Sequence, residues 1–323
     1  MSDRAAFIRA IVAAPDDDIP RLVFADWLEE SGDESDRARA EFIRVQCESA
    51  SLPADDPRRA ELERREEELL RSHGRFFSPV PTFRDDWYLE RGNARMNYPY
   101  GGQLRWHRGF PRWAQFGIED YPAKVEETLT REAVFDASLE FYGGFDQSEA
   151  EPAWLTEVCA SPRFALVGML NLCDTLFCVA GPPSRFLTLI RSPHLTGLKH
   201  VAVFKDFIGL GGVRAMVESP TPFRLQSLSL GCIIEPAYAE IGQAEDFIAA
   251  VQLIAQSPRM ASLEHLDIDA FYDAEGHGET IAAELLASPY LSPSLSLRFS
   301  AYPDTDRIRE QLAQRFQLVR EDS

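Results

Sequence analysis

The sequence predicts an α/β protein in which a small all-helical N-terminal module precedes a solenoid of strand–loop–helix repeats. Two observations support this prediction. Apolar residues recur at helical spacing through roughly the first 72 residues. Beyond residue 110, five Ser-Pro pairs recur at similar intervals, and an alternating apolar segment follows each of them.

The first two helices are indicated by their apolar spacing and by the residues that precede them. Phe7, Ile8, Ile11 and Val12 recur at helical spacing, with Ser2 or Asp3 placed to cap the helix. In "PDDDIPRLVFADWLEESGD", residues 15–33, Asp18 is expected to accept a hydrogen bond from the N–H of Arg21, and Gly32 is expected to end the helix. Three consecutive carboxylates cannot all point at one ion from a helix start, so Asp16, Asp17 and Asp18 indicate a helix start and not a metal site.

The apolar residues of this second helix form one broad stripe of the kind found in amphipathic helices: Ile19, Leu22, Val23, Trp27 and Leu28. A third helix is expected at about 36–50. A fourth is expected at about 57–72, where charges alternate in sign at three- and four-residue spacing as on a solvated helix, and His73-Gly74 is expected to end it.

Residues 1–75 resemble the bacterial repeat-companion domain. The resemblance rests on "PDDDIPRLVFADWLEESGD" followed by "RAEFIRVQ" and "REEELLRSHG". It implies a short helical module at the N-terminus of proteins that carry leucine-rich-repeat-like arrays, and it carries over no catalytic residues. The segment "ESDRARAEF" is longer than the usual turn into the third helix, so the start of that helix is open.

Residues 76–109 differ in composition, because proline and glycine punctuate a stretch rich in aromatic residues. Disordered linkers are poor in aromatics, so we expect an ordered connector. Its end, "WHRGF", is expected to lead into the first strand of an array spanning residues 110–323.

The array is predicted from Ser-Pro pairs whose prolines are residues 162, 193, 220, 258 and 289, and from the apolar segments that follow. "LKHVAVFKDFI" comes nearest to the L-x-x-L-x-L-x-x-N-x-L template, with Asp206 in place of Asn, and each such segment is followed by an amphipathic helical stretch. The pattern resembles a leucine-rich-repeat solenoid of about six to seven irregular repeats. An ordinary α/β domain is the alternative fold.

In such an array the residues between the template positions would line a concave strand face. The residues expected there are Tyr142, Asn171, Asp174, Phe204, Lys205, Asp267, Asp269 and Arg298, with Asp269 opposite Arg298. Aromatic side chains among polar ones are typical of protein-binding surfaces. The other interpretation is that most of these positions are only solvated.

A metal site is the alternative use of this face. His265, Asp267 and Asp269 alternate, so a strand places all three side chains on one side, where a hard cation would accept such ligands. This alternative predicts a metal-dependent hydrolase. Cys173 and Cys178 have no histidine placed to activate them, and the common catalytic fingerprints do not occur in the sequence.

Composition narrows the classes of function. The net charge is −19, from 33 basic and 52 acidic side chains, without a basic stripe. This argues against binding to nucleic acid or to an anionic membrane. The five scattered cysteines and the charged N-terminus favour a cytoplasmic protein without a cofactor. The sequence therefore favours a non-enzymatic interaction protein whose partner has a basic patch. A further possibility is that the helical module binds the partner and the array acts only as a spacer.

Overall fold

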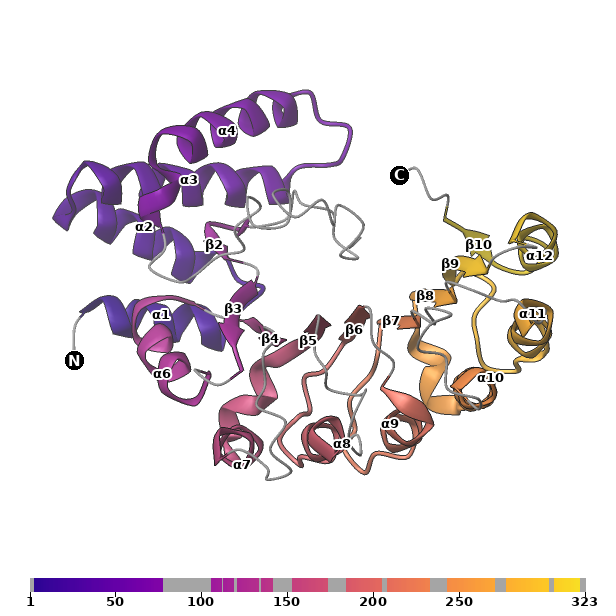
Figure 1. Ribbon diagram of the computed structural model, residues 1–323. Coiled ribbons are helices and arrows are strands. Elements are labelled where there is room, and N and C mark those ends of the chain that lie inside the picture. The colour runs from indigo at the N-terminus through magenta and orange to yellow at the C-terminus, as the bar shows by residue number, and fades with distance from the viewer. Residues whose placement is uncertain are drawn as a thin grey trace. The chain divides into compact units, whose positions relative to one another are not determined.

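The computed structural model shows a mixed α/β chain with a helical N-terminal region (Figure 1). It describes residues 3–77, 106–111, 113–118, 121–133, 135–141, 153–173, 184–204, 208–232, 243–270, 277–301 and 305–319. The chain divides into two compact units. The first unit comprises Met1–Phe116 and Ala123–Ala137, and the second comprises Gly117–Pro122 and Ser138–Ser323. The boundaries expected from the sequence, near residues 75 and 110, both fall inside the first unit.

The first unit begins with four helices. They are α1 (Asp3–Ala13), α2 (Ile19–Ser31), α3 (Glu34–Ser51) and α4 (Arg58–Phe77). The prediction that His73-Gly74 ends the fourth helix is wrong, because α4 continues to Phe77. The Phe77 ring is buried 4.9 Å from that of Phe42, so the last turn of α4 is stabilised by packing.

The start of α2 differs from the expected cap. Asp18 occupies the N-cap position, but its side chain makes no capping hydrogen bond. Instead, Asp17 Oδ1 accepts a hydrogen bond from the N–H of Ile19 at 2.9 Å, and Asp18 Oδ1 accepts one from Arg108 at 3.1 Å. The expected end of the helix is confirmed, since the N–H of Gly32 donates to the carbonyl of Leu28.

The "WHRGF" segment forms a β-hairpin of the first unit and does not enter the parallel sheet. Strand β1 (Trp106–His107) pairs antiparallel with β2 (Phe110–Pro111). Arg108 and Gly109 turn the chain with φ of 51° and 86°, which glycine accepts readily at the second position. Phe110 is fully buried in the core of this unit, together with Ile8, Ile11, Phe24, Leu28 and Ile43.

A buried ion pair ties the helices to a later part of the first unit. Glu132 follows helix α6 (Tyr121–Arg131) and accepts hydrogen bonds from both terminal nitrogens of Arg39 at 2.7 and 3.0 Å. The side chains of Glu132 and Arg39 are 0% and 2% exposed. Arg39 also donates to the carbonyl of Gly109 and lies over the Phe110 ring. The fold of the helical module therefore depends on residues far beyond 75.

Most of the second unit is built around one sheet, whose first strand, Trp113–Gly117, belongs largely to the first unit. The strands of this sheet follow the order β10-β9-β8-β7-β6-β5-β4-β3, eight in the described part of the chain, and every pair from β5 to β10 is parallel. The strands are β3 (Trp113–Gly117), β4 (Asp136–Phe141), β5 (Val167–Cys173), β6 (His200–Phe204), β7 (Ser227–Cys232), β8 (His265–Ala270), β9 (Ser296–Ala301) and β10 (Gln317–Leu318).

The predicted alternation of strand and helix is confirmed. The helices between the strands are α7 (Ala153–Ala160), α8 (Ser184–Ile190), α9 (Gly209–Val217), α10 (Gln243–Ala255), α11 (His277–Ala287) and α12 (Thr305–Leu312). In Figure 1 these helices lie along one side of the sheet. Short 3₁₀ helices at Pro162–Leu166 and Pro258–Ser262 follow two of the Ser-Pro pairs. In the described part of the chain, every helix is too short or too polar to cross a membrane.

The serines of the five Ser-Pro pairs all make the same turn. The hydroxyl of each serine accepts a hydrogen bond from the backbone N–H two residues later, at 3.2–3.3 Å. Three of them also donate to a carbonyl of the preceding turn: Ser192 to Cys159, Ser219 to Ile190 and Ser288 to Ala255. These serines therefore link one helix end to the next along the stack.

Candidate partner-binding surfaces

The strands of the second unit present two different faces. Side chains at alternate positions of β7, β8 and β9 are almost fully buried: Leu228, Leu230, Leu266, Ile268, Leu297 and Phe299. The residues between them are polar and partly exposed: Ser227, Ser229, Asp267, Ser296, Arg298 and Ser300, with His265 exposed. Successive side chains of a strand point to opposite faces, so one face holds the core and the other is polar.

The cross-strand register places five residues in one row of this polar face. Asn171, Ala202, Ser229, Asp267 and Arg298 are paired in order across β5 to β9. The expected pairing of Asp269 with Arg298 is wrong, because Asp269 is paired with Ser300. The reason is that β9 aligns Ser296 with His265, two residues away from the register expected from the apolar template.

Asp267, the fourth residue of the row, binds both of its neighbours. Its Oδ2 accepts a hydrogen bond from Ser229 at 3.2 Å and forms an ion pair with Arg298. The side chains of Asp267 and Arg298 are 20% and 23% exposed. Among the described residues, the buried Oδ1 of Asp267 has no hydrogen-bond donor. A carboxylate has about four acceptor positions, so the described residues leave part of the acceptor capacity of Asp267 unused.

The other residues expected on this face are only partly described. Asn171 lies in the row, but its surface is 1% exposed, in contrast to the exposed position expected from the sequence. Phe204 and Asp269 lie in β6 and β8, and their side chains are outside the described part. Tyr142, Asp174 and Lys205 lie wholly outside the described residues.

The expected metal ligands show no shared site in the described part of the chain. Asp267 binds Arg298, and the side chain of His265 is exposed. No group of three or more His, Cys, Asp or Glu side chains with suitable placement for a metal ion occurs among the described residues. Cys173 and Cys178 have no described side chains.

Burial raises the pKa of the Cys47 thiol to about 12, with the carboxylate of Asp18 adding to the effect.

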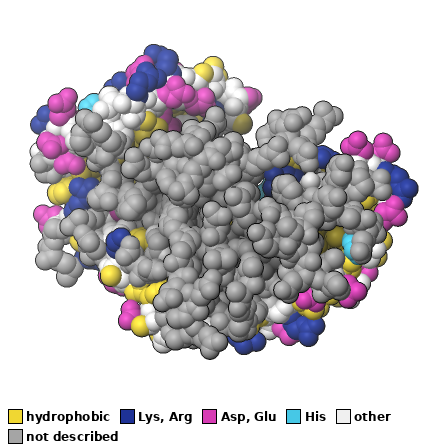
Figure 2. Space-filling model, viewed as in Figure 1, with side chains coloured by type: hydrophobic (Ala, Val, Ile, Leu, Met, Phe, Trp, Pro, Cys, Tyr) yellow, Lys and Arg dark blue, Asp and Glu magenta, His cyan; other side chains and the backbone are white. Residues whose placement is uncertain are grey.

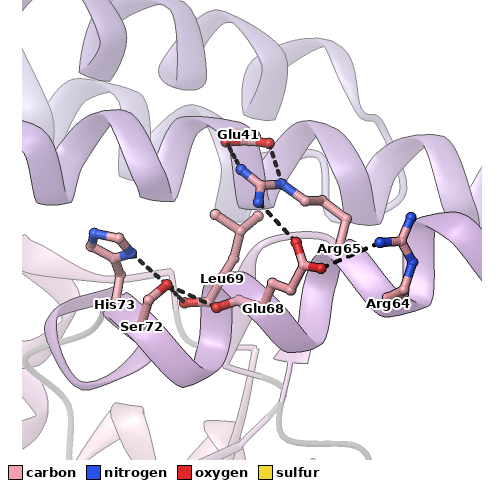
Figure 3. Close-up of polar contacts among 7 residues, drawn as sticks. All are labelled: Glu41, Arg64, Arg65, Glu68, Leu69, Ser72 and His73. Atoms are coloured by element: carbon pink, nitrogen blue, oxygen red, sulfur yellow. Dashed lines mark hydrogen bonds and ion pairs between the residues drawn. The ribbon is translucent and has the colours of Figure 1, made fainter.

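The surface of α3 and α4 carries many charges, and described residues pair several of them. Figure 3 shows Arg65 of α4 between Glu41 of α3 and Glu68, with distances of 2.6–3.0 Å. The hydrogen bonds from Arg65 lower the pKa of Glu41. In Figure 2 acidic and basic side chains alternate over the part of the surface where α4 lies. This confirms the solvated helix expected from the alternating charges.

A second surface was not expected from the sequence. Three of the four large hydrophobic side chains that are exposed in the described part of the chain lie on α2: Ile19, Leu22 and Val23, which are 67%, 38% and 47% exposed. The sequence pattern predicts that they share one stripe with Trp27 and Leu28. The structure divides that stripe, because the buried face of α2 consists of Arg21, Phe24, Ala25 and Leu28. Apolar periodicity alone does not reveal this division, because a charged residue, Arg21, lies on the core side of the helix.

Comparison with family models, with curated proteins and with solved structures gives no match to this chain.

Proposed function

We propose that the chain is a non-enzymatic protein–protein interaction scaffold that presents the polar face of its parallel sheet to a protein partner. The observation that carries the proposal is the row Ser229–Asp267–Arg298 on a sheet face opposite the buried apolar positions. These side chains are held in place by one another, which lowers the entropy lost when a partner orders them.

The finer description of the fold belongs to the same proposal. We infer that the second unit is a leucine-rich-repeat-like solenoid, supported by strand order that follows the sequence, parallel pairing and the recurring serine turns. The resemblance of the N-terminal segment to the repeat-companion domain fits such an array. A cytoplasmic location and a partner with a basic patch accord with the net charge of −19.

The test is affinity capture from a lysate with three forms of the full chain. The first is the natural sequence. The second is Asp267→Asn/Arg298→Gln, which removes both charges of the row and leaves the net charge unchanged. The third is Glu41→Gln/Arg65→Gln, which removes an exposed ion pair from α3 and α4 in the same way. Circular dichroism and thermal unfolding establish that all three are folded.

A partner captured by the natural chain and by the α3–α4 variant, but lost by the Asp267/Arg298 variant, is the expected result. Binding should also weaken as salt is raised, because oppositely charged surfaces are screened. Equal capture by all three forms would contradict the proposed sheet face. Stoichiometric metal in the purified protein, lost in Asp267→Ala, would instead support the metal-dependent hydrolase.

A further inference from the structure

The exposed aliphatic residues of α2 form a continuous surface. Ile19, Leu22 and Val23 have the i, i+3, i+4 spacing that places side chains on one side of a helix. Asp26 and Glu30 follow on the same side, and both are exposed. The residues of the opposite side, Arg21, Phe24 and Leu28, are buried in the first unit. We call the exposed residues Ile19, Leu22, Val23, Asp26 and Glu30 the α2 face.

The stability of α2 does not explain the aliphatic residues of this face. Ile and Val have lower helix propensity than Ala, Glu or Lys, which suit exposed helix positions better. A hydrophobic staple would pair the residue before the N-cap with the fourth residue of the helix. Here those residues are Asp17 and Leu22, so Leu22 has no apolar partner of that kind. Their exposure is better explained by a contact outside the chain.

The charges around the α2 face define what that contact must be. Exposed carboxylates lie at both ends of the aliphatic residues: Asp16 and Asp17 before them, and Asp26, Glu29 and Glu30 after them. Arg44 pairs with both Asp26 and Glu29, at 2.8 and 2.6 Å. Arg108 binds Asp18 and the carbonyl of Asp16. Arg44 and Arg108 are therefore already bound to groups of the first unit, and carboxylates outnumber these arginines at both ends of the aliphatic residues.

We propose that the α2 face docks a basic amphipathic helix of a partner protein. Aliphatic side chains of such a helix would cover Ile19, Leu22 and Val23, and its Lys or Arg residues would meet the carboxylates on either side. Helices recognise surfaces in this way through anchors spaced at i, i+3, i+4 and i+7. The α2 face, from residue 19 to residue 30, extends about 16 Å at 1.5 Å per residue, which is room for three turns of a partner helix. An anionic lipid surface would be repelled by the same carboxylates.

This inference does not depend on the proposed sheet-face function, because the α2 face belongs to the first unit and the polar strand row to the second. Either surface can bind without the other. The variants that test them share no residue, so failure of one proposal is distinguishable from failure of the other.

The experiment titrates the full chain with a synthetic fluorescent peptide of about 18 residues of Leu and Lys, arranged so that Leu covers one side of a helix. A peptide of the same composition in scrambled order is the control ligand. Binding is followed by fluorescence anisotropy at two salt concentrations. Vesicles containing anionic lipid are tested in a parallel sedimentation assay.

Two variants test the aliphatic residues of the α2 face and the exposed carboxylates around them. Ile19→Ser/Leu22→Ser/Val23→Ser removes the aliphatic residues, and Asp16→Asn/Asp17→Asn/Glu30→Gln removes three carboxylates. The Asp17→Asn substitution keeps the side-chain oxygen that accepts a hydrogen bond from the N–H of Ile19. The matched control, Glu61→Gln/Glu63→Gln/Glu67→Gln, changes the net charge equally through exposed residues of α4. Thermal unfolding verifies that every variant is folded.

We expect the amphipathic peptide to bind the natural chain and the α4 control equally. The serine variant should bind at least about tenfold more weakly, and the carboxylate variant should bind more weakly with less dependence on salt. Equal binding by all four proteins would overturn the proposal, as would equal binding of the scrambled peptide, which would show charge attraction alone. Vesicle binding that the serine variant abolishes would also overturn it, in favour of a lipid surface.

Discussion

Removal of Glu132 is expected to destabilise the first unit strongly. Its carboxylate accepts two hydrogen bonds from Arg39, with both side chains at most 2% exposed. In Glu132→Leu the guanidinium of Arg39 stays buried. Its remaining contacts are the carbonyl of Gly109 at 3.4 Å and the ring of Phe110. Breaking a buried pair by removing one partner typically costs about 3–5 kcal/mol.

Urea unfolding followed by tryptophan fluorescence measures this loss. Trp154 is the one tryptophan in the sequence of the second unit, so a Trp154→Phe background restricts the signal to the first unit. Small proteins have urea slopes of about 1–3 kcal/mol per M, so a loss of about 4 kcal/mol lowers the midpoint by roughly 1.3–4 M. Hydrogen exchange of amides in the second unit serves as the internal control.

The double variant Arg39→Met/Glu132→Leu separates pairing from packing. Replacing both partners by apolar residues of similar size is often neutral or stabilising, so the double variant should recover most of the lost free energy of unfolding. A single variant within about 1 kcal/mol of the natural chain would refute the reasoning, since surface substitutions give changes of that size. A double variant as unstable as the single one would show that the stability of the first unit depends on the shape of these two side chains and not on their charges.

Three further predictions follow from single residues, each measured by urea unfolding. Ser288→Ala should cost about 1–3 kcal/mol, because it leaves a buried carbonyl and two backbone N–H groups without a partner, whereas exposed Ser294→Ala should change little. Gly109→Ala should cost more than Gly209→Ala: both have positive φ, but of these two positions only residue 109 would bring an added Cβ into collision with Ile43. Finally, burial raises the pKa of the Cys47 thiol to about 12 from 9.0. The unfolded thiol therefore ionises first as pH rises, and the free energy of unfolding should fall between about pH 9 and 12 by up to about 1.4 kcal/mol per unit. Cys47→Ala should fall less steeply over that range, and identical slopes would contradict the buried thiol.

The sequence predicted the elements of both units better than it predicted their boundaries. The alternation of strands and helices could be predicted, because each strand buries the side chains of one face and each helix buries those of one stripe. The segment "WHRGF" was expected only to lead into the first strand of the array, and its packing in the core of the first unit was not predicted, since the burial of Phe110 against α2 and α3 is a contact between distant segments. Local patterns cannot report such a contact.

The candidate surfaces show the same limit. The row from Asn171 to Asp267 followed from the apolar template, but Arg298 lies two residues away from its expected place. A shift of two residues keeps the same side chains on the buried face, so the apolar pattern cannot distinguish the two registers. The exposed side of α2 was hidden because Arg21, a charged residue, occupies its core side. Arg21 is buried by donating to the carbonyls of Pro15 and Asp17, an arrangement that residue type alone does not indicate.

The serine turns explain how the second unit tolerates unequal spacing. The prolines of the five Ser-Pro pairs are 31, 27, 38 and 31 residues apart. Such unequal spacing is inconsistent with a repeat of fixed length. The hydrogen bonds impose a different constraint. Ser192, Ser219 and Ser288 each donate to the carbonyl that stands two residues before the preceding serine.

This relation fixes where one helix ends relative to the next, and it leaves the length of the intervening chain free. Arg259 and Arg315 reinforce it, because each donates to the carbonyl of the preceding serine, Ser219 and Ser288. Insertions between a strand and its helix then cost only loop-closure entropy, which grows slowly with length. A serine hydroxyl therefore holds one helix end beside the previous one at three of the four intervals, and Arg259 does so at the 38-residue interval.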